Sequence, residues 1–180
     1  MIKTENFEKV EVGSQTELRA WLVTYKKEIK DKYVSTGEVL DELLCFGWID
    51  GIRRKLDDRR TMQLISPRKT QHWAKTYKDR VAKLKKDGKM HEAGLKSIEI
   101  SKKNGLWNFM DDVHKLIKPN DLELALSRNL DANQFFDDIN DSSKRFILRW
   151  LKLSKTEKTR ESRIQKIVDL LAKGEKLPGS

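Results

Sequence analysis

The apolar positions between residues 35 and 47 recur at helical spacing. Ser35 and Glu38 form a capping box, in which each side chain satisfies a backbone N–H of the first helical turn, and Gly47 is a typical residue at a helix end. The pattern therefore predicts a helix that ends before Gly47. Its apolar face consists of Val39, Leu40, Leu43, Leu44 and Phe46.

Two short apolar stretches follow this helix. "WIDGIRR" (48–54) and "RTMQLIS" (60–66) are separated by the polar "KLDD", and Pro67 follows the second. Two apolar runs around a polar loop are typical of a β-hairpin, and proline is seldom found inside a sheet. We expect an antiparallel hairpin that ends at Pro67.

The segment 15–29 has two interpretations. Ser14 and Glu17 suit a capping box, and apolar residues from Leu18 to Ile29 follow helical spacing. "WLVTYKK" is also typical of a strand, with alternate residues such as Trp21 and Val23 on one face. We expect a helix to about residue 22 and leave a strand open beyond it.

The rest of the chain has helical periodicity. The apolar spacing predicts helices in six segments, the first two ending at Gly88 and Gly105 and the third beginning at an Asn120 cap. These segments are 70–88, 91–105, 120–129, 131–140, 142–154 and 155–174. The tail "EKLPGS" is expected to be frayed.

A small antiparallel sheet followed by helices indicates an α+β fold. We expect residues 1–103 to form an α+β core with the hairpin, and residues 104–180 to form a helical region packed on it. The connections are short, and the sequence has no internal repeat or low-complexity tract.

The charge of the chain is unevenly distributed. The net charge is +10. Residues 53–103 contain 17 basic and 6 acidic side chains, and residues 104–143 contain 3 basic and 8 acidic ones. Residues 144–180 are again basic, with 11 basic and 4 acidic side chains. Such segregation indicates a surface for a polyanion, a solvated charged face, or pairing between the blocks.

Several function classes have no support in the sequence. No phosphate-binding glycine loop and no G-x-S-x-G nucleophile motif is present. His72, His91 and His114 lie far apart, and Cys45 is the single cysteine, so we expect no metal and no cofactor. Cys45 lies in an apolar run and is expected to be a buried core thiol. No run is long enough to span a bilayer and no secretory leader is recognisable, so we expect a cytoplasmic protein.

The candidate site lies in "CFGWIDGIRRKLDDRR" (45–60). Asp50 sits in a predicted strand, where a buried carboxylate needs a partner. One interpretation is an Asp–Arg bridge that fastens the hairpin to the next helix. The other is a concave site for an anion or a partner. The residues assigned to that site are Trp48, Asp50, Arg53, Asp57, Gln63, Arg68 and Trp73.

Two segments combine basic and aromatic residues in a way that suits nucleic acid. These are "SPRKTQHWAKTYKDR" (66–80) and "KRFILRWLKLSKTEKTRESR" (144–163). Trp73 and Tyr77 lie four residues apart, a spacing that also fits a core stripe. No zinc-finger or RNP motif accompanies them.

Several motifs resemble those of the YdeI/OmpD-associated, bacteriocin-protection family. They include "DELLCFGWIDG", "KLDD" with a following "SPRK", "GKMHEAGLKSIEISKKNGLW" and the terminal "KTRESRIQKIVDLLAKGE". The resemblance covers about residues 14–176. Relative to the family pattern, "ELRAWLVTYKK" fuses a first helix and a separate strand, as if roughly ten residues were missing.

The resemblance implies a bacterial protein with a role in tolerance of bacteriocins or cationic antimicrobial peptides, and an outer-membrane porin as a partner. It supplies no catalytic residues. Three functions follow as hypotheses: a stress-tolerance protein that acts by binding, a nucleic-acid-binding or regulatory module, and an enzyme that uses Asp50 or Asp57 with nearby arginines. The first is preferred, and an enzyme is the least expected.

Overall fold

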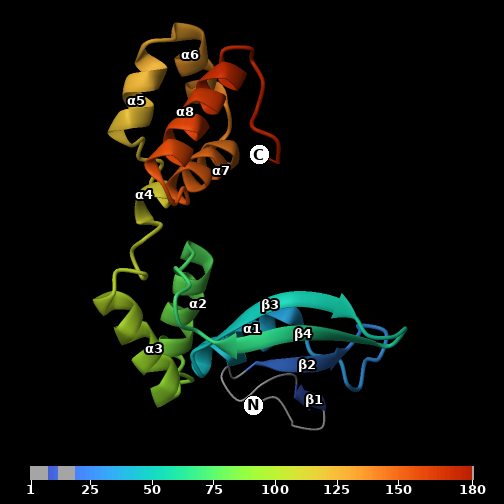
Figure 1. Cartoon of the computed structure of the whole chain (residues 1–180). Helices are drawn as coiled ribbons and strands as arrows, with labels where there is room; N and C mark the ends of the chain where they lie inside the picture. The colour runs from blue at the N-terminus through green and yellow to red at the C-terminus, as the bar shows by residue number, and fades with distance from the viewer. Residues whose placement is uncertain (1–7, 12–18, 180) are drawn as a thin grey trace. The chain divides into compact units, whose positions relative to one another are not determined.

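A computed structural model describes residues 8–11 and 19–179 of the chain. The described chain divides into two compact units, one ending at Asn108 and the other beginning at Phe109 (Figure 1). The fold is α+β, as predicted: the sheet lies in the N-terminal half and helices make up the C-terminal half. The division at residue 103, and the packing of one part on the other, stay predictions.

The first unit contains an antiparallel sheet of four strands in the order β1-β2-β4-β3. The strands are β1 (Glu8–Glu11), β2 (Ala20–Tyr25), β3 (Trp48–Lys55) and β4 (Arg60–Pro67). β2 is central and pairs with both β1 and β4. The hairpin of β3 and β4 confirms the prediction, including the end of the strand at Pro67.

The expected helix to about residue 22 is wrong where the structure describes it, because Ala20–Tyr25 is a strand. Pairing with strands on both sides satisfies the backbone groups of β2, and this tertiary environment outweighs the local helical spacing. The predicted capping box of Ser14 and Glu17 lies outside the described residues.

A bulge interrupts the pairing of β3 with β4 between Asp50 and Arg53. Gly51 lies in this bulge, where a Cβ atom would stand 3.1 Å from the carbonyl oxygen of Leu64. Glycine therefore permits the close approach of the two strands beside Asp50.

Helix α1 (Thr36–Cys45) covers one face of the sheet. Its capping box forms as predicted, and Gly47 follows with a φ of 75°. Val39 and Leu43 pack against Leu22, Trp48 and Ile65 of the sheet. Phe46 departs from the predicted apolar face: it caps the helix, is 44% exposed and stacks on His91.

Helices α2 (Lys75–Lys86) and α3 (Glu92–Lys103) complete the first unit. They end before Gly88 and Gly105, which have positive φ angles, as predicted. Their core contains Trp73 and Ile98 with the end of α1. Cys45 is buried in this core, and burial raises the pKa of its thiol, which confirms the prediction of a core thiol.

The second unit is helical. Its elements are α4 (Asp111–His114), α5 (Asn120–Ser127), α6 (Leu130–Asp138), α7 (Asp141–Lys152) and α8 (Glu157–Leu171). The predicted Asn120 cap is wrong: Asn120 is the first helical residue, and Pro119 precedes it without a side-chain cap. Leu177 is 5% exposed and packs in the core of this unit, so the tail is ordered there and not frayed.

Candidate functional site

Asp50 lies on β3 beside the bulge, and two side chains donate hydrogen bonds to it. The hydroxyl group of Tyr77 on α2 donates to Oδ1 at 2.7 Å. The amide of Gln63 on β4 donates to Oδ2 at 3.4 Å. These contacts connect both strands of the hairpin to α2.

Arg53 extends this network to α1. Its Nη2 donates to Gln63 Oε1 at 3.1 Å, and its Nη1 donates to Thr36 Oγ1 at 2.9 Å. Gln63 is only 6% exposed and contacts both Asp50 and Arg53. The amide thus orients a carboxylate and a guanidinium that form no direct ion pair with each other.

Arg68 is 8% exposed, which is rare for an arginine. Its guanidinium lies over the ring of Trp73, 4.0 Å from the ring centroid, and 5.3 Å from that of Tyr77. Nη1 donates to the carbonyl oxygens of Gln71 and His72, at 3.4 Å each. Burial lowers the pKa of Arg68, and the nearby Tyr77 and Asp50 oppose that shift. Aromatic rings and carbonyl groups, in place of a carboxylate, surround the guanidinium, and among the described residues its Nε and Nη2 have no hydrogen-bond partner.

The structure thus gathers five of the seven predicted site residues: Asp50, Arg53, Gln63, Arg68 and Trp73. Tyr77 completes the cluster, and burial, followed by its hydrogen bond to Asp50, raises its pKa to about 12. A tyrosine with a raised pKa keeps its proton, so it suits a structural hydrogen bond better than the role of a base.

The other two predicted residues lie elsewhere. Trp48 lines an apolar pocket of about 200 Å³ with Leu43, Phe46 and Ile65. Asp57 lies in the loop between β3 and β4 and accepts hydrogen bonds from the backbone N–H groups of Arg59 and Arg60. The length of β3 separates Asp57 from the cluster around Asp50.

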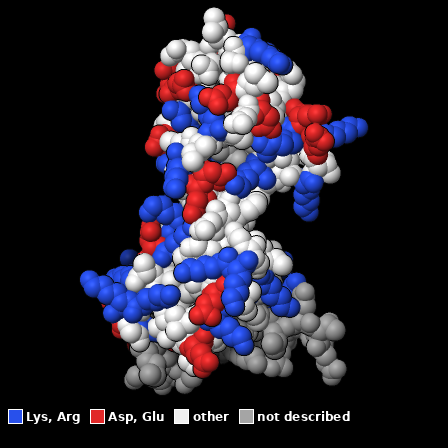
Figure 2. Space-filling model, turned by 90° about the vertical axis from the view of Figure 1, so that its left-hand side faces the viewer, with Lys and Arg blue, Asp and Glu red and all other residues white. Residues whose placement is uncertain are grey.

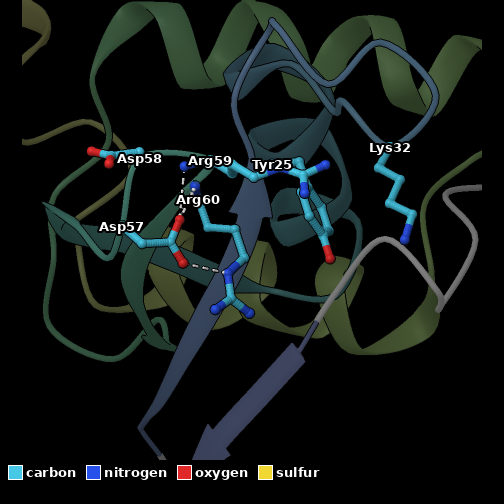
Figure 3. Close-up of a pocket in the computed structure, with 6 residues that line it drawn as sticks. All are labelled: Tyr25, Lys32, Asp57, Asp58, Arg59 and Arg60. Atoms are coloured by element: carbon cyan, nitrogen blue, oxygen red, sulfur yellow. Dashed lines mark hydrogen bonds and ion pairs between the residues drawn. The ribbon is translucent and has the colours of Figure 1, made fainter.

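A second pocket, of about 410 Å³, lies at this loop (Figure 3). We call it the loop pocket. Sequence reasoning missed Tyr25 and Lys32, which line it, because the pairing of Tyr25 with Arg60 and the bridge between Tyr25 and Tyr33 bring them to the loop. The lining residues are Tyr25, Lys32, Asp57, Asp58, Arg59 and Arg60.

A basic face extends over α2 and α3. Residues 75–103 contain ten basic and four acidic side chains. Figure 2 looks at the side of this unit on which α3 lies and shows Lys and Arg gathered there, with fewer Asp and Glu among them. The exposed lysines of these helices and their connecting turn are Lys75, Lys83, Lys85, Lys86, Lys89, Lys96, Lys102 and Lys103.

A half-buried aromatic side chain belongs to this face. Trp107 packs against Trp73, with ring centroids 4.9 Å apart. The ammonium groups of Lys78 and Lys102 lie 5.4 and 5.5 Å from the centroid of its ring. Cations and an aromatic ring are thus combined on one surface, the combination that the sequence suggested for nucleic acid.

Among residues 8–11 and 19–179, no group of three or more His, Cys, Asp or Glu side chains is placed to hold a metal ion. Within the same residues, no helix has the length and apolar character needed to cross a membrane.

Comparison with protein families divides the chain in a similar way. Residues 5–97, just over half of the chain, match a domain of unknown function, DUF8412. Residues 115–174 match the family described as bacteriocin-protection, YdeI or OmpD-associated, which confirms the predicted family over that segment. The "GWIDG" motif lies in the segment matched by the other family. Neither the curated proteins nor the solved structures include a match to this chain.

Proposed function

We propose that this chain, which belongs to the DUF8412 family and carries a C-terminal unit of the bacteriocin-protection, YdeI or OmpD-associated family, acts by binding nucleic acid. The binding surface in this proposal is the basic face of α2 and α3. The observation that carries the proposal is the set of exposed lysines on these helices, together with the half-buried Trp107, whose ring lies near Lys78 and Lys102.

Electrostatics supports a polyanion as the partner. Asp79, one of the four acidic residues in 75–103, is paired with Lys75 at 2.8 Å. The remaining excess of lysines would release counterions from a phosphate backbone, which favours sequence-independent binding. Trp107 offers a ring on which a base can stack.

A role in bacteriocin tolerance, named in the description of the C-terminal family, belongs to the same proposal. Residues 53–103 repel a cationic peptide, so the protein would act on an anionic target of such peptides and not by capturing them. The cytoplasm is the compartment in which we place this activity, because nucleic acid is found there.

The enzyme hypothesis gains less support from the geometry. Asp50 is hydrogen-bonded to Tyr77 and Gln63, and Arg68 is packed between aromatic rings and carbonyl groups. These contacts suit a cluster that holds the hairpin to α2.

The test is fluorescence anisotropy of labelled single-stranded and duplex oligonucleotides, measured from low to physiological salt. The informative variant combines Lys85→Ala, Lys86→Ala and Lys89→Ala, which removes three exposed lysines from the end of α2 and its turn. We expect weaker binding, and a slope of log K against log salt that is smaller by about 2 for a single strand if all three contact phosphates.

The matched control combines Lys155→Ala, Lys158→Ala and Lys166→Ala, three exposed lysines of the second unit. It changes the net charge by the same amount. Equal loss of binding in both triple variants, or no binding by the unaltered protein even at low salt, would contradict the proposal.

A further inference from the structure

The loop pocket lies on the first unit, where the end of β2 meets the loop between β3 and β4. Its volume of about 410 Å³ falls within the range typical of small-molecule sites. Three cationic side chains, two carboxylates and one aromatic ring line it. The balance of these charges decides which ligand the pocket can accept.

Both carboxylates are paired within the loop. Asp57 accepts hydrogen bonds from the backbone N–H groups of Arg59 at 2.8 Å and Arg60 at 2.7 Å, and from Arg60 Nε at 2.7 Å. Asp58 pairs with Lys55 at 2.6 Å. The hydrogen bonds from Arg60 and the backbone lower the pKa of Asp57, so its carboxylate holds the loop over the neutral pH range.

The loop is also attached to the end of β2. Lys26 donates from its backbone N–H to the carbonyl oxygen of Arg59, and from Nζ to that of Asp58, at 2.9 Å in each case. Both backbone groups of Arg59 are thus engaged, which fixes the backbone from which its exposed side chain extends. Such preorganisation favours binding because less conformational entropy is lost.

Two cations of the pocket remain uncompensated. Lys32 lies over the ring of Tyr25, 5.3 Å from the centroid, and Figure 3 shows Tyr25 between the loop and Lys32, with Arg60 turned toward Asp57. In the described part of the chain, neither Lys32 nor Arg59 forms a side-chain ion pair. The site therefore presents two positive charges beside an aromatic ring.

We propose that the loop pocket binds a phosphate monoester, with the phosphate in contact with Lys32 and Arg59 and the organic group against Tyr25. A phosphate monoester carries a charge of about −1.5 to −2 at pH 7, which matches two cations. The planar guanidinium of arginine suits phosphate oxygens. The volume leaves room for an organic group beside the phosphate.

The ligand can be a free organic phosphate or the phosphorylated end of a nucleic-acid strand. This site is separate from the basic face of α2 and α3, so the inference goes beyond the proposed function. Isothermal titration with adenosine 5′-monophosphate and with adenosine distinguishes a phosphate site from a nonspecific aromatic contact. We expect the first to bind and the second not to bind.

Anisotropy with the same oligonucleotide carrying a 5′-phosphate or a 5′-hydroxyl identifies the source. Tighter binding of the phosphorylated strand assigns the site to strand ends, whereas equal binding, together with binding of the mononucleotide, assigns it to free organic phosphates. No binding of the mononucleotide and no preference between the two strands would overturn the proposal.

The variants Lys32→Ala and Arg59→Ala should each weaken mononucleotide binding roughly 10- to 100-fold, because each removes a charge-assisted contact. Lys27→Ala is the matched control, since Lys27 is exposed, lies in the same segment and does not line the pocket. An equal loss in Lys27→Ala would indicate a general charge effect and contradict the proposed site.

The triple variant of α2 separates this inference from the proposed function. It should bind the mononucleotide normally even where it loses affinity for long strands. Failure of one proposal therefore leaves the other open to its own test.

Discussion

At the scale of single residues, Asp50 shows how a carboxylate is accommodated in a hairpin. The sequence predicted that it needs a partner and suggested an arginine. In the described chain the partners are the hydroxyl of Tyr77 and the amide of Gln63, and no arginine lies within ion-pair distance. The predicted link between the hairpin and the following helix is present, but a tyrosine forms it.

The variant Tyr77→Phe tests this link. It removes a hydrogen bond to a charged group while keeping the ring, so we expect a loss of about 1.5–3 kcal/mol in the free energy of unfolding. Chemical denaturation measures the difference. Tyr33→Phe is the control, because Tyr33 is exposed and lies outside the cluster, and it should leave stability unchanged.

Alkaline pH provides a second measurement on the same pair. The pKa of Tyr77 is raised to about 12 in the folded protein, above its ordinary value of 10.0. The hydroxyl therefore adds stability below about pH 10, and this is lost as the pH rises through about 12. Between about pH 10 and 12, the free energy of unfolding of the Tyr77→Phe variant should therefore fall less than that of the unaltered protein. An identical decline in both proteins would contradict the assignment.

At the scale of elements, α3 crosses the end of α1 at Gly94. A Cβ atom there would stand 2.2 Å from the carbonyl oxygen of Cys45 and 2.9 Å from that of Leu44. Both atoms belong to the backbone, so they cannot rotate away. Gly94 thus sets the distance between the two helices and keeps Cys45 in the shared core.

Gly94→Ala should destabilise the first unit despite the better helix propensity of alanine. Alanine gains about 1 kcal/mol in a helix relative to glycine, whereas overpacking against backbone typically loses 1–3 kcal/mol, so the net effect is a loss. Thermal unfolding checks this. Gly37→Ala serves as the control, because its Cβ would meet only ordinary contacts, from 3.6 Å, and should be neutral or stabilising.

At the scale of the whole molecule, the two units differ in architecture and in charge. The first combines the sheet with the lysine-rich helices, and the second is a helical unit whose core includes Leu126, Ile147 and Leu171. Ion pairs such as Arg160 with Asp121, at 2.5 Å, connect helices within the second unit. Each unit has a core of its own. A substitution in the core of one unit is therefore expected to destabilise that unit without altering binding by the other.

Ile147→Ala should destabilise the second unit by about 2–5 kcal/mol, because it leaves a cavity in a fully buried position. Affinity for nucleic acid should stay unchanged at temperatures where the first unit remains folded. Denaturation and anisotropy on the same sample measure both effects, with the exposed Leu124→Ala as control. A parallel loss of affinity would place part of the binding surface in the second unit.

The sequence by itself determined the elements that depend on local chemistry. The capping box at Ser35, the helix ends at Gly47, Gly88 and Gly105, and the hairpin ending at Pro67 follow from backbone preferences that neighbouring residues set. The α+β class follows from the same local patterns, whereas the family of the C-terminal segment was predicted from the resemblance of motifs such as "KTRESRIQKIVDLLAKGE".

Only the tertiary structure decided where distant side chains meet. Pairing on both sides made Ala20–Tyr25 a strand, and the length of β3 separated Asp57 from Asp50. The same sheet brought Tyr25 to Arg60 and created the loop pocket. Such contacts depend on which strands pair and which helices pack together, and these choices are made between residues far apart in the chain, whereas the periodic pattern of a segment describes only its own residues.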